Sequence, residues 1–186
     1  KRLYFGTQRV WRSDNRGDSW TAISGDLTKN EERLALPIMG RQQSFDNPWD
    51  VYAMSTYNTI TSLSESKSNP GVLYAGTDDG IIQYTKDGGT NWTKMTVDKL
   101  PGAPSTAFVN DIKVDLHDNN TAYVALDNHK YGDYDPYLYK TTNGGKDWES
   151  IGSGIPEGTL VWRIVQDHVN PNLLFLATEY GVYISL

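Results

Sequence analysis

The residues best suited to chemistry in this chain are carboxylates placed in turns. Two carboxylates that face each other across a cleft, about 6.5–9.5 Å apart, can cleave a glycosidic bond with inversion, one as general acid and the other as general base. Five carboxylates are candidates for such a pair: Asp78, Asp79, Asp133, Asp135 and Glu179. Asp78, Asp79 and Glu179 are also candidates for binding a ligand. No convergence of any two can be read from the sequence, so hairpin turns with solvated carboxylates are the favoured interpretation.

A second group of acidic residues suggests a metal. Asp127, Asp133 and Asp135 lie close together in the chain, with His129 between them. Carboxylate oxygens are hard ligands, which suit Ca²⁺. Their spacing matches no known calcium-binding loop, so a polar surface loop is the favoured interpretation. Calcium is therefore a weak expectation, and the sequence indicates no other cofactor.

A motif that occurs three times indicates which elements position these residues. Its template is Ser/Thr-x-Asp/Asn-x-Gly-x-x-Trp. The three copies comprise Ser13, Asn15, Gly17 and Trp20, then Thr85, Asp87, Gly89 and Trp92, then Thr141, Asn143, Gly145 and Trp148. Hydroxyl and Asp/Asn side chains bond to nearby turn amides, and glycine adopts a positive φ at little cost. The tryptophan then covers the hairpin. These motif residues are expected to be structural.

Each motif belongs to a longer repeat. An aromatic or apolar strand precedes each hairpin, at 3–7, 72–77 and 121–126, and recurs at 173–178. Earlier strands are expected at 59–64, 108–115 and 161–166, each separated from the next by a turn rich in Asn, Pro or Asp. One full unit is thus four short antiparallel strands. Such units in series are the blades of a β-propeller, and the predicted fold is an all-β propeller segment with these hairpins joining the third and fourth strands.

Two tryptophans fall outside the hairpins and the strands that lead into them. Trp49 lies in a long connection beside polar residues, where it could stack on a sugar ring or pin the connection to a blade. Trp162 and Arg163 begin an expected innermost strand, so one of the two is expected to face the central channel. All three are candidate ligand-binding residues.

The repeat divides the chain into parts of one incomplete propeller domain. We expect a partial blade at 1–24, an inserted connection at 25–58, a blade at 59–98, a linker at 99–106, a blade at 107–152 and a partial blade at 160–186. An arc of this size cannot close into a ring. We therefore expect the chain to be a segment of a larger propeller, whose remaining blades are its first partner.

The motifs resemble the Asp-box, or BNR, repeat propellers. Besides the three hairpins, the resemblance rests on the stretches 74–80, 136–142 and 170–175. That superfamily includes sialidases, xyloglucan-active glycoside hydrolases, a photosystem II assembly factor and sortilin-type sorting receptors. The chain is most similar to bacterial sortilin-like and "glycosyl hydrolase, BNR repeat" proteins. The resemblance implies a bacterial protein that is secreted or on the cell surface, and it implies more about fold than about function.

Composition excludes several classes of partner. The net charge is −6 and no Lys/Arg cluster occurs, so nucleic acid is a poor partner. No apolar run approaches the length of a membrane span. The chain has no cysteine, which excludes disulfides and thiolate sites and fits a bacterial secreted or surface protein.

We expect a non-catalytic propeller that binds a protein, peptide or glycan; a polysaccharide hydrolase with paired carboxylates is the alternative.

Overall fold

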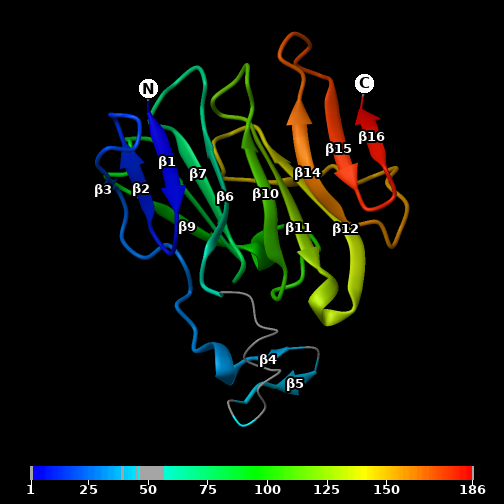
Figure 1. The fold of residues 1–186 in the computed structure, drawn as a ribbon. Helices are drawn as coiled ribbons and strands as arrows, with labels where there is room; N and C mark the ends of the chain where they lie inside the picture. Colours follow the sequence, from blue (N-terminus) through cyan, green and yellow to red (C-terminus); the bar gives the residue numbers. More distant parts are fainter. Residues whose placement is uncertain (1, 39, 45, 47–56, 186) are drawn as a thin grey trace.

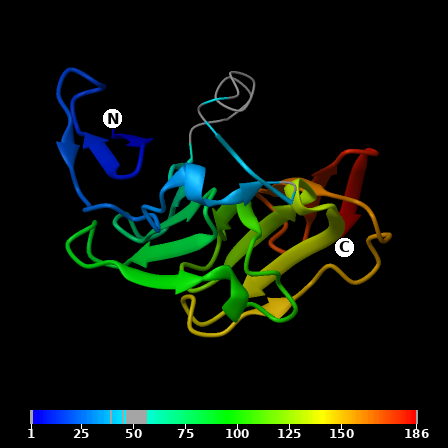
Figure 2. The ribbon, with the colours of Figure 1, turned by 90° about the horizontal axis from the view of Figure 1, so that it is seen from below.

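The chain folds into four antiparallel sheets that follow one another in an arc (Figure 1). The computed structural model describes residues 2–38, 40–44, 46 and 57–185. Within that part there is no α-helix, only three short 3₁₀ helices: η1 (Arg33–Ala35), η2 (Val97–Lys99) and η3 (His129–Tyr131). Seen from below in Figure 2, the first and last sheets lie at opposite ends of the arc. The predicted all-β propeller segment is confirmed.

Strands are consecutive neighbours within every sheet. The first sheet contains β1 (Leu3–Gly6), β2 (Val10–Ser13) and β3 (Thr21–Ala22); the second contains β6 (Ile60–Glu65), β7 (Leu73–Thr77), β8 (Ile81–Thr85) and β9 (Thr93–Thr96). The third contains β10 (Phe108–Val114), β11 (Ala122–Asn128), β12 (Asp133–Thr141) and β13 (Glu149–Ser150); the fourth contains β14 (Val161–Gln166), β15 (Leu174–Thr178) and β16 (Val182–Ser185). A small pair, β4 (Pro37–Ile38) and β5 (Arg41–Gln42), lies in the long connection between the first two sheets.

Every innermost strand carries the same irregularity. The pairing of β6, β10 and β14 shifts by one residue near the strand start, which leaves Thr61, Asn110 and Trp162 as the extra residue of a β-bulge. The Thr61 hydroxyl donates to the Val109 carbonyl of the next sheet at 2.6 Å. In the same way the Asn110 amide donates to the Val161 carbonyl at 3.0 Å. The bulge residue therefore ties each sheet to its successor.

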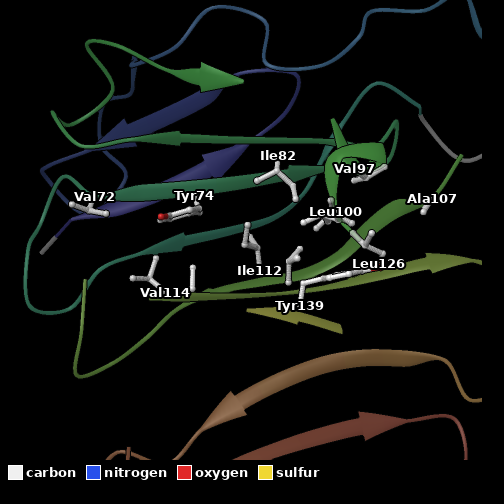
Figure 3. Packing of buried hydrophobic residues seen from close by; sticks show 13 residues of the cluster. Val72, Tyr74, Ile82, Val97, Leu100, Ala107, Ile112, Val114, Leu126 and Tyr139 are labelled. Carbon is white, nitrogen blue, oxygen red and sulfur yellow. The ribbon is translucent and has the colours of Figure 1, made fainter. Parts of the chain in front are cut away.

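The hydrophobic core lies between the sheets. Figure 3 shows the largest cluster, which fills the space between the second and third sheets; it includes Val72, Tyr74, Ile82, Val97, Leu100, Ala107, Ile112, Val114, Leu126 and Tyr139. Smaller clusters lie between the third and fourth sheets and between the first and second. Each sheet thus buries its faces against its neighbours, as in other repeat folds where units contact only the next unit.

The two ends of the arc expose surface that the inner sheets bury. The third strand of each sheet has one equivalent position, which pairs with an equivalent position of the second strand. The residues at this position are Val10, Ile82, Leu138 and Val182. The first three are at most 1% exposed, whereas Val182 is 65% exposed. At the other end, Phe5 of β1 is 58% exposed. A further sheet at each end would bury this surface, so the arc is part of a propeller.

The three repeated hairpins share one hydrogen-bond pattern. In the second sheet, the Thr85 hydroxyl donates to Asp87 Oδ1 at 2.8 Å and accepts from the Gly89 N–H at 3.1 Å. The corresponding bonds recur in the other two hairpins, through Ser13, Asn15 and Gly17 and through Thr141, Asn143 and Gly145. Asn replaces Asp without loss of the pattern because only a side-chain oxygen acceptor is required.

The motif tryptophans differ in what they contact. Trp92 packs against the core between the first and second sheets, and its indole N–H donates to the Ile23 carbonyl of the first sheet at 3.1 Å. Trp148 packs against the largest core, and its buried Nε1 has no hydrogen-bond partner within the described part of the chain. Trp20 is 41% exposed and bonds only within its own turn, to the Gly17 carbonyl.

Replacing Trp92 by alanine is expected to destabilise the chain far more than the same change at Trp20. Trp92 joins two sheets, whereas Trp20 contacts only residues of its own sheet, namely Phe5 and the hairpin. Buried Trp-to-Ala changes cost about 3–5 kcal/mol, and Trp92 should lie near the lower end of that range with Trp20 at less than half of it. Urea unfolding measures both. Equal losses at the two positions would contradict this account of the hairpins.

Replacing Gly76 by alanine is expected to separate the second and third sheets. A Cβ at Gly76 would lie 2.3 Å from Val109 Cγ1 of the next sheet. Overpacking of this kind costs about 1–3 kcal/mol. Gly25 is the matched control because nothing lies within 4 Å of its position for a Cβ. Thermal unfolding should show a lower Tm for Gly76→Ala and little change for Gly25→Ala; an unchanged Tm for both would contradict the close packing.

Candidate ligand-binding face at the loop end of the sheets

Each sheet has two distinct ends. The repeated hairpins lie beside the turns that join first to second strands, as shown by the bond from the Gly88 N–H to the Gly71 carbonyl at 2.9 Å. We call this the hairpin end. The opposite end, which we call the loop end, carries the turns between second and third strands and the long connection from the first sheet (Figure 1). All the candidate residues that the structure describes lie at the loop end.

An acidic residue lies at or just beyond the end of the second strand in three successive sheets. Asp78, Asp127 and Glu179 occupy this shared place, one residue beyond the pair that precedes the bulge of the innermost strand. Asp78 Oδ1 accepts from the Thr59 N–H at 2.8 Å, and Glu179 Oε1 accepts from the Leu160 N–H at 3.4 Å. These two carboxylates therefore cap the entrance to the innermost strand, as the hairpin-turn interpretation expects.

Asp79 fastens the long connection to the second sheet. Its carboxylate is 3% exposed, and it accepts from the Lys29 N–H at 2.6 Å and from the Thr77 hydroxyl. Close by, the buried Gln83 amide donates to the Leu27 carbonyl at 2.8 Å. These contacts hold residues 27–29 against the loop end. Asp79 is thus brought to the candidate face, but it is turned toward the connection and away from solvent.

Asp78 lines a small enclosed cavity beneath the connection. The cavity has a volume of about 30 Å³ and is lined by Arg33, Leu36, Tyr57, Asp78, Thr106, Phe108, Lys130 and Tyr131. That volume is on the scale of one or two water molecules and does not accommodate a sugar ring. Burial raises the pKa of Asp78 from its ordinary 3.8 to about 6. The hydrogen bond from the Thr59 N–H opposes this rise, as does the charge of Lys130, whereas the charge of Asp79 adds to it.

The predicted calcium ligands are not brought together. Asp133 accepts from the Asn128 amide at 2.8 Å and from the Tyr137 hydroxyl at 2.9 Å. Asp127 is directed instead at His129, and Asp135 donates its own N–H to Asp133 at 3.1 Å. Over the described residues, no three His, Asp or Glu side chains are grouped so that they could hold a metal ion. The carboxylates of Asp127 and Asp133 instead accept from backbone N–H groups of this loop.

Exposed aromatic side chains gather on the loop end. Tyr131 ends η3, between the second and third strands of the third sheet, and Tyr134 lies at the start of β12; Tyr180 belongs to the turn between the second and third strands of the fourth sheet. Trp162 lies at the bulge of β14 with Arg163 exposed beside it. All four aromatic residues are more than a third exposed. Trp49, the other predicted stacking residue, lies outside the described residues.

One arrangement was not predicted from the sequence. The buried carboxylate of Asp127 lies 2.7 Å from His129 Nδ1, and the His129 ring makes T-shaped contacts with Phe108 and Trp162, with ring centroids 6.0 and 6.2 Å away. The four residues come from β10, β11, η3 and β14. An Asp-x-His sequence at the end of a strand is the only local signal, and it does not reveal the two aromatic neighbours.

Comparison with solved structures shows the fold. An ancestral GH74 enzyme matches 99% of this chain with a TM-score of 0.64 at 16% identity, and the GH74 enzyme of Niastella koreensis matches 95% with a TM-score of 0.59 at 17% identity. YCF48 from Cyanidioschyzon merolae matches 68% with a TM-score of 0.50 at 18% identity. The chain spans 21%, 25% and 36% of these proteins, respectively.

Comparisons by sequence add no relative. No protein-family model and no curated protein matches the chain. The solved structures are β-propeller proteins, so at these identities they show a partial propeller and leave its activity open. No helix among the described residues is long and apolar enough to cross a membrane.

Replacing Asp78 by asparagine is expected to change how stability depends on pH. Asp78 keeps its proton to about pH 6 when folded but loses it near pH 4 when unfolded, so wild-type folding loses stability as pH rises through this window. The side-chain oxygen of asparagine can still accept from the Thr59 N–H, but asparagine does not titrate, so the loss of stability with rising pH is removed. The stability of Asp78→Asn relative to wild type should therefore rise between about pH 4 and 6, measured by urea unfolding. A constant difference across that window would contradict the assignment.

Proposed function

We propose that this chain is part of a non-catalytic recognition propeller of the Asp-box type, which binds a glycan, peptide or protein at its loop end. The observation that carries the proposal is the composition of that end. Exposed aromatic side chains gather there, while the carboxylates beside them are already bonded to the chain's own N–H and O–H groups.

The carboxylates have structural partners. Asp79 is buried under the connection, Asp78 lines the enclosed cavity, and Asp133 accepts from two side chains. Glu179 caps the start of β14. An inverting hydrolase needs two carboxylates on either side of an open cleft that admits the sugar and a water. Within the described part of the loop end, these four are committed to holding turns and strand starts.

The aromatic side chains are suited to binding. Tyr and Trp offer a large apolar surface with a polar group at its edge, and they lose little conformational entropy when they are held. They are also the residue types that contribute most to affinity in many interfaces. These residues come from turns, a strand start and a bulge at one end of the sheets: Tyr131, Tyr134, Trp162 and Tyr180. Binding residues are commonly found in such places on a rigid scaffold.

Two further parts of the proposal rest on the hairpins and on the ends of the arc. The shared Ser/Thr, Asp/Asn and Gly hydrogen bonds support an Asp-box assignment and, with it, a sortilin-like or BNR-repeat protein. The exposure of Val182 and Phe5 supports further blades of the same propeller as the first partner. A secreted or surface location follows from the resemblance and from the absence of cysteine.

One observation favours a second candidate, the glycoside hydrolase. Asp78 has a pKa of about 6, which suits a general acid near neutral pH. Its cavity would have to open, by movement of the connection that Asp79 holds, before a sugar could reach it. We rank this candidate second because no second carboxylate faces Asp78 across that cavity within the described residues.

The two candidates differ in what happens to a polysaccharide. The 186-residue chain is incubated with plant and mucin polysaccharides; retention is measured by affinity electrophoresis, and products are measured by chromatography of the supernatant. The proposal expects retention, or binding of a peptide ligand, without released oligosaccharides. Release that disappears in Asp78→Asn would instead establish the hydrolase and overturn the proposal.

A further inference from the structure

We propose that His129 and Trp162, with Asp127 behind them, form a subsite for one sugar residue of a neutral glycan. The inference rests on the proposed recognition function and identifies which ligand and which residues it involves. It is carried by three independent features: a buried carboxylate that orients an imidazole, an imidazole nitrogen left available to a ligand, and an exposed indole beside it.

The carboxylate of Asp127 is dedicated to His129. Asp127 is fully buried, and its Oδ1 accepts from the His129 backbone N–H at 2.8 Å while its Oδ2 lies 2.7 Å from Nδ1. At the equivalent place in the neighbouring sheets, Asp78 and Glu179 cap the innermost strand instead. A repeated capping position has thus been redirected, in this sheet alone among the described ones, toward a histidine side chain.

The orientation of the imidazole follows from its partner. A carboxylate only accepts hydrogen bonds, so Nδ1 carries the hydrogen and donates to Asp127. In the neutral ring Nε2 is then an acceptor with a fixed direction. The side chain of His129 is 36% exposed, and its Nε2 has no partner in the part of the chain that the structure describes. The result is an oriented polar group presented to solvent.

The aromatic neighbours hold the ring and extend the surface. Phe108 contacts His129 at an interplanar angle of 71°, and Trp162 contacts it at 63°. Trp162 is the bulge residue of β14, and it is 38% exposed. Thr61 and Asn110, its equivalents, use polar atoms to bond the next sheet. The indole at this position instead contributes a partly exposed aromatic surface beside the imidazole.

This combination matches a pyranose ring. One face of such a ring carries C–H groups that pack on an aromatic surface, and its rim carries hydroxyls that both donate and accept. The centroids of His129 and Trp162 are 6.2 Å apart, so a ring stacked on the indole would bring a rim hydroxyl within reach of Nε2. Lys130, whose ammonium lies 5.0 Å from the Phe108 ring, can donate to a further hydroxyl.

The test is a titration of the 186-residue chain with neutral hexasaccharides: cellohexaose, xylohexaose and mannohexaose. We expect at least one to bind, with affinity lowered about tenfold or more in Trp162→Ala, as for an aromatic residue central to a binding site. His129→Phe keeps the packing between Phe108 and Trp162 but removes both nitrogens. It should bind about two- to tenfold more weakly, the loss expected for one hydrogen bond.

Two matched variants control for general effects. Trp20→Ala removes a comparably exposed tryptophan at the hairpin end, and His168→Ala removes an exposed histidine far from η3. Both should bind as wild type does. As a measurement that needs no variant, the ¹⁵N resonance of His129 Nε2 should shift on adding the bound sugar, because that nitrogen accepts a new hydrogen bond.

The outcomes separate this inference from the proposed function. Binding that is unchanged in Trp162→Ala and His129→Phe, or an Nε2 resonance that does not move, would overturn the subsite and leave a recognition propeller that uses another surface. Failure of every hexasaccharide to bind wild type would overturn the subsite and point to a peptide or protein ligand. Release of shorter sugars would overturn the non-catalytic function, and the two variants would still decide whether His129 and Trp162 hold the sugar.

Discussion

The structure depends on contact between the innermost strands of adjacent sheets. Asp111 in β10 is 1% exposed; its Oδ1 accepts from the Ser62 hydroxyl of the preceding sheet at 2.9 Å, and its Oδ2 accepts from the Ile164 N–H of the following sheet at 3.0 Å. A buried charge is stable only when it is fully bonded, and Lys113 completes the set at 3.1 Å. One side chain therefore ties three sheets together. Each sheet is short and few-stranded, so its stability comes from its neighbours.

This constraint divides the molecule into a frame and a variable end. The hairpin end repeats the same bonds three times and packs Trp92 and Trp148 toward the cores, so it is used for stability. The loop end differs from sheet to sheet: one turn holds the long connection, one forms η3, and one is a short turn with an exposed tyrosine. Variation on a repeated frame is the arrangement in which loops carry function. The redirection of Asp127 from a strand cap to a histidine partner is an example of such variation.

Much of the frame could be predicted from the sequence, and little of the site. The three hairpins, the strands and the turns are local patterns, and Thr85, Asp87 and Gly89 bond within eight residues as their spacing requires. Asp79 was predicted as a turn carboxylate and as a candidate for catalysis or ligand binding; its role in fastening the connection was not predicted, because its partner, Lys29, is 50 residues away. Trp162 was assigned to an innermost strand, but its contact with His129 depends on a bulge that shifts the register, and no single-sequence pattern shows it. Trp49 lies outside the described residues, and its stacking role stays a prediction.

The account holds that ligand binds at the loop end, on a surface that the third and fourth sheets share. Hydrogen–deuterium exchange with the tightest-binding member of the hexasaccharide set tests this most directly, because it reports every peptide without a substitution. The account predicts added protection in residues 127–131 and 161–163, which surround His129 and Trp162, and none in the hairpins at 85–92 and 141–148. Protection confined to the hairpins, or none anywhere, would contradict it.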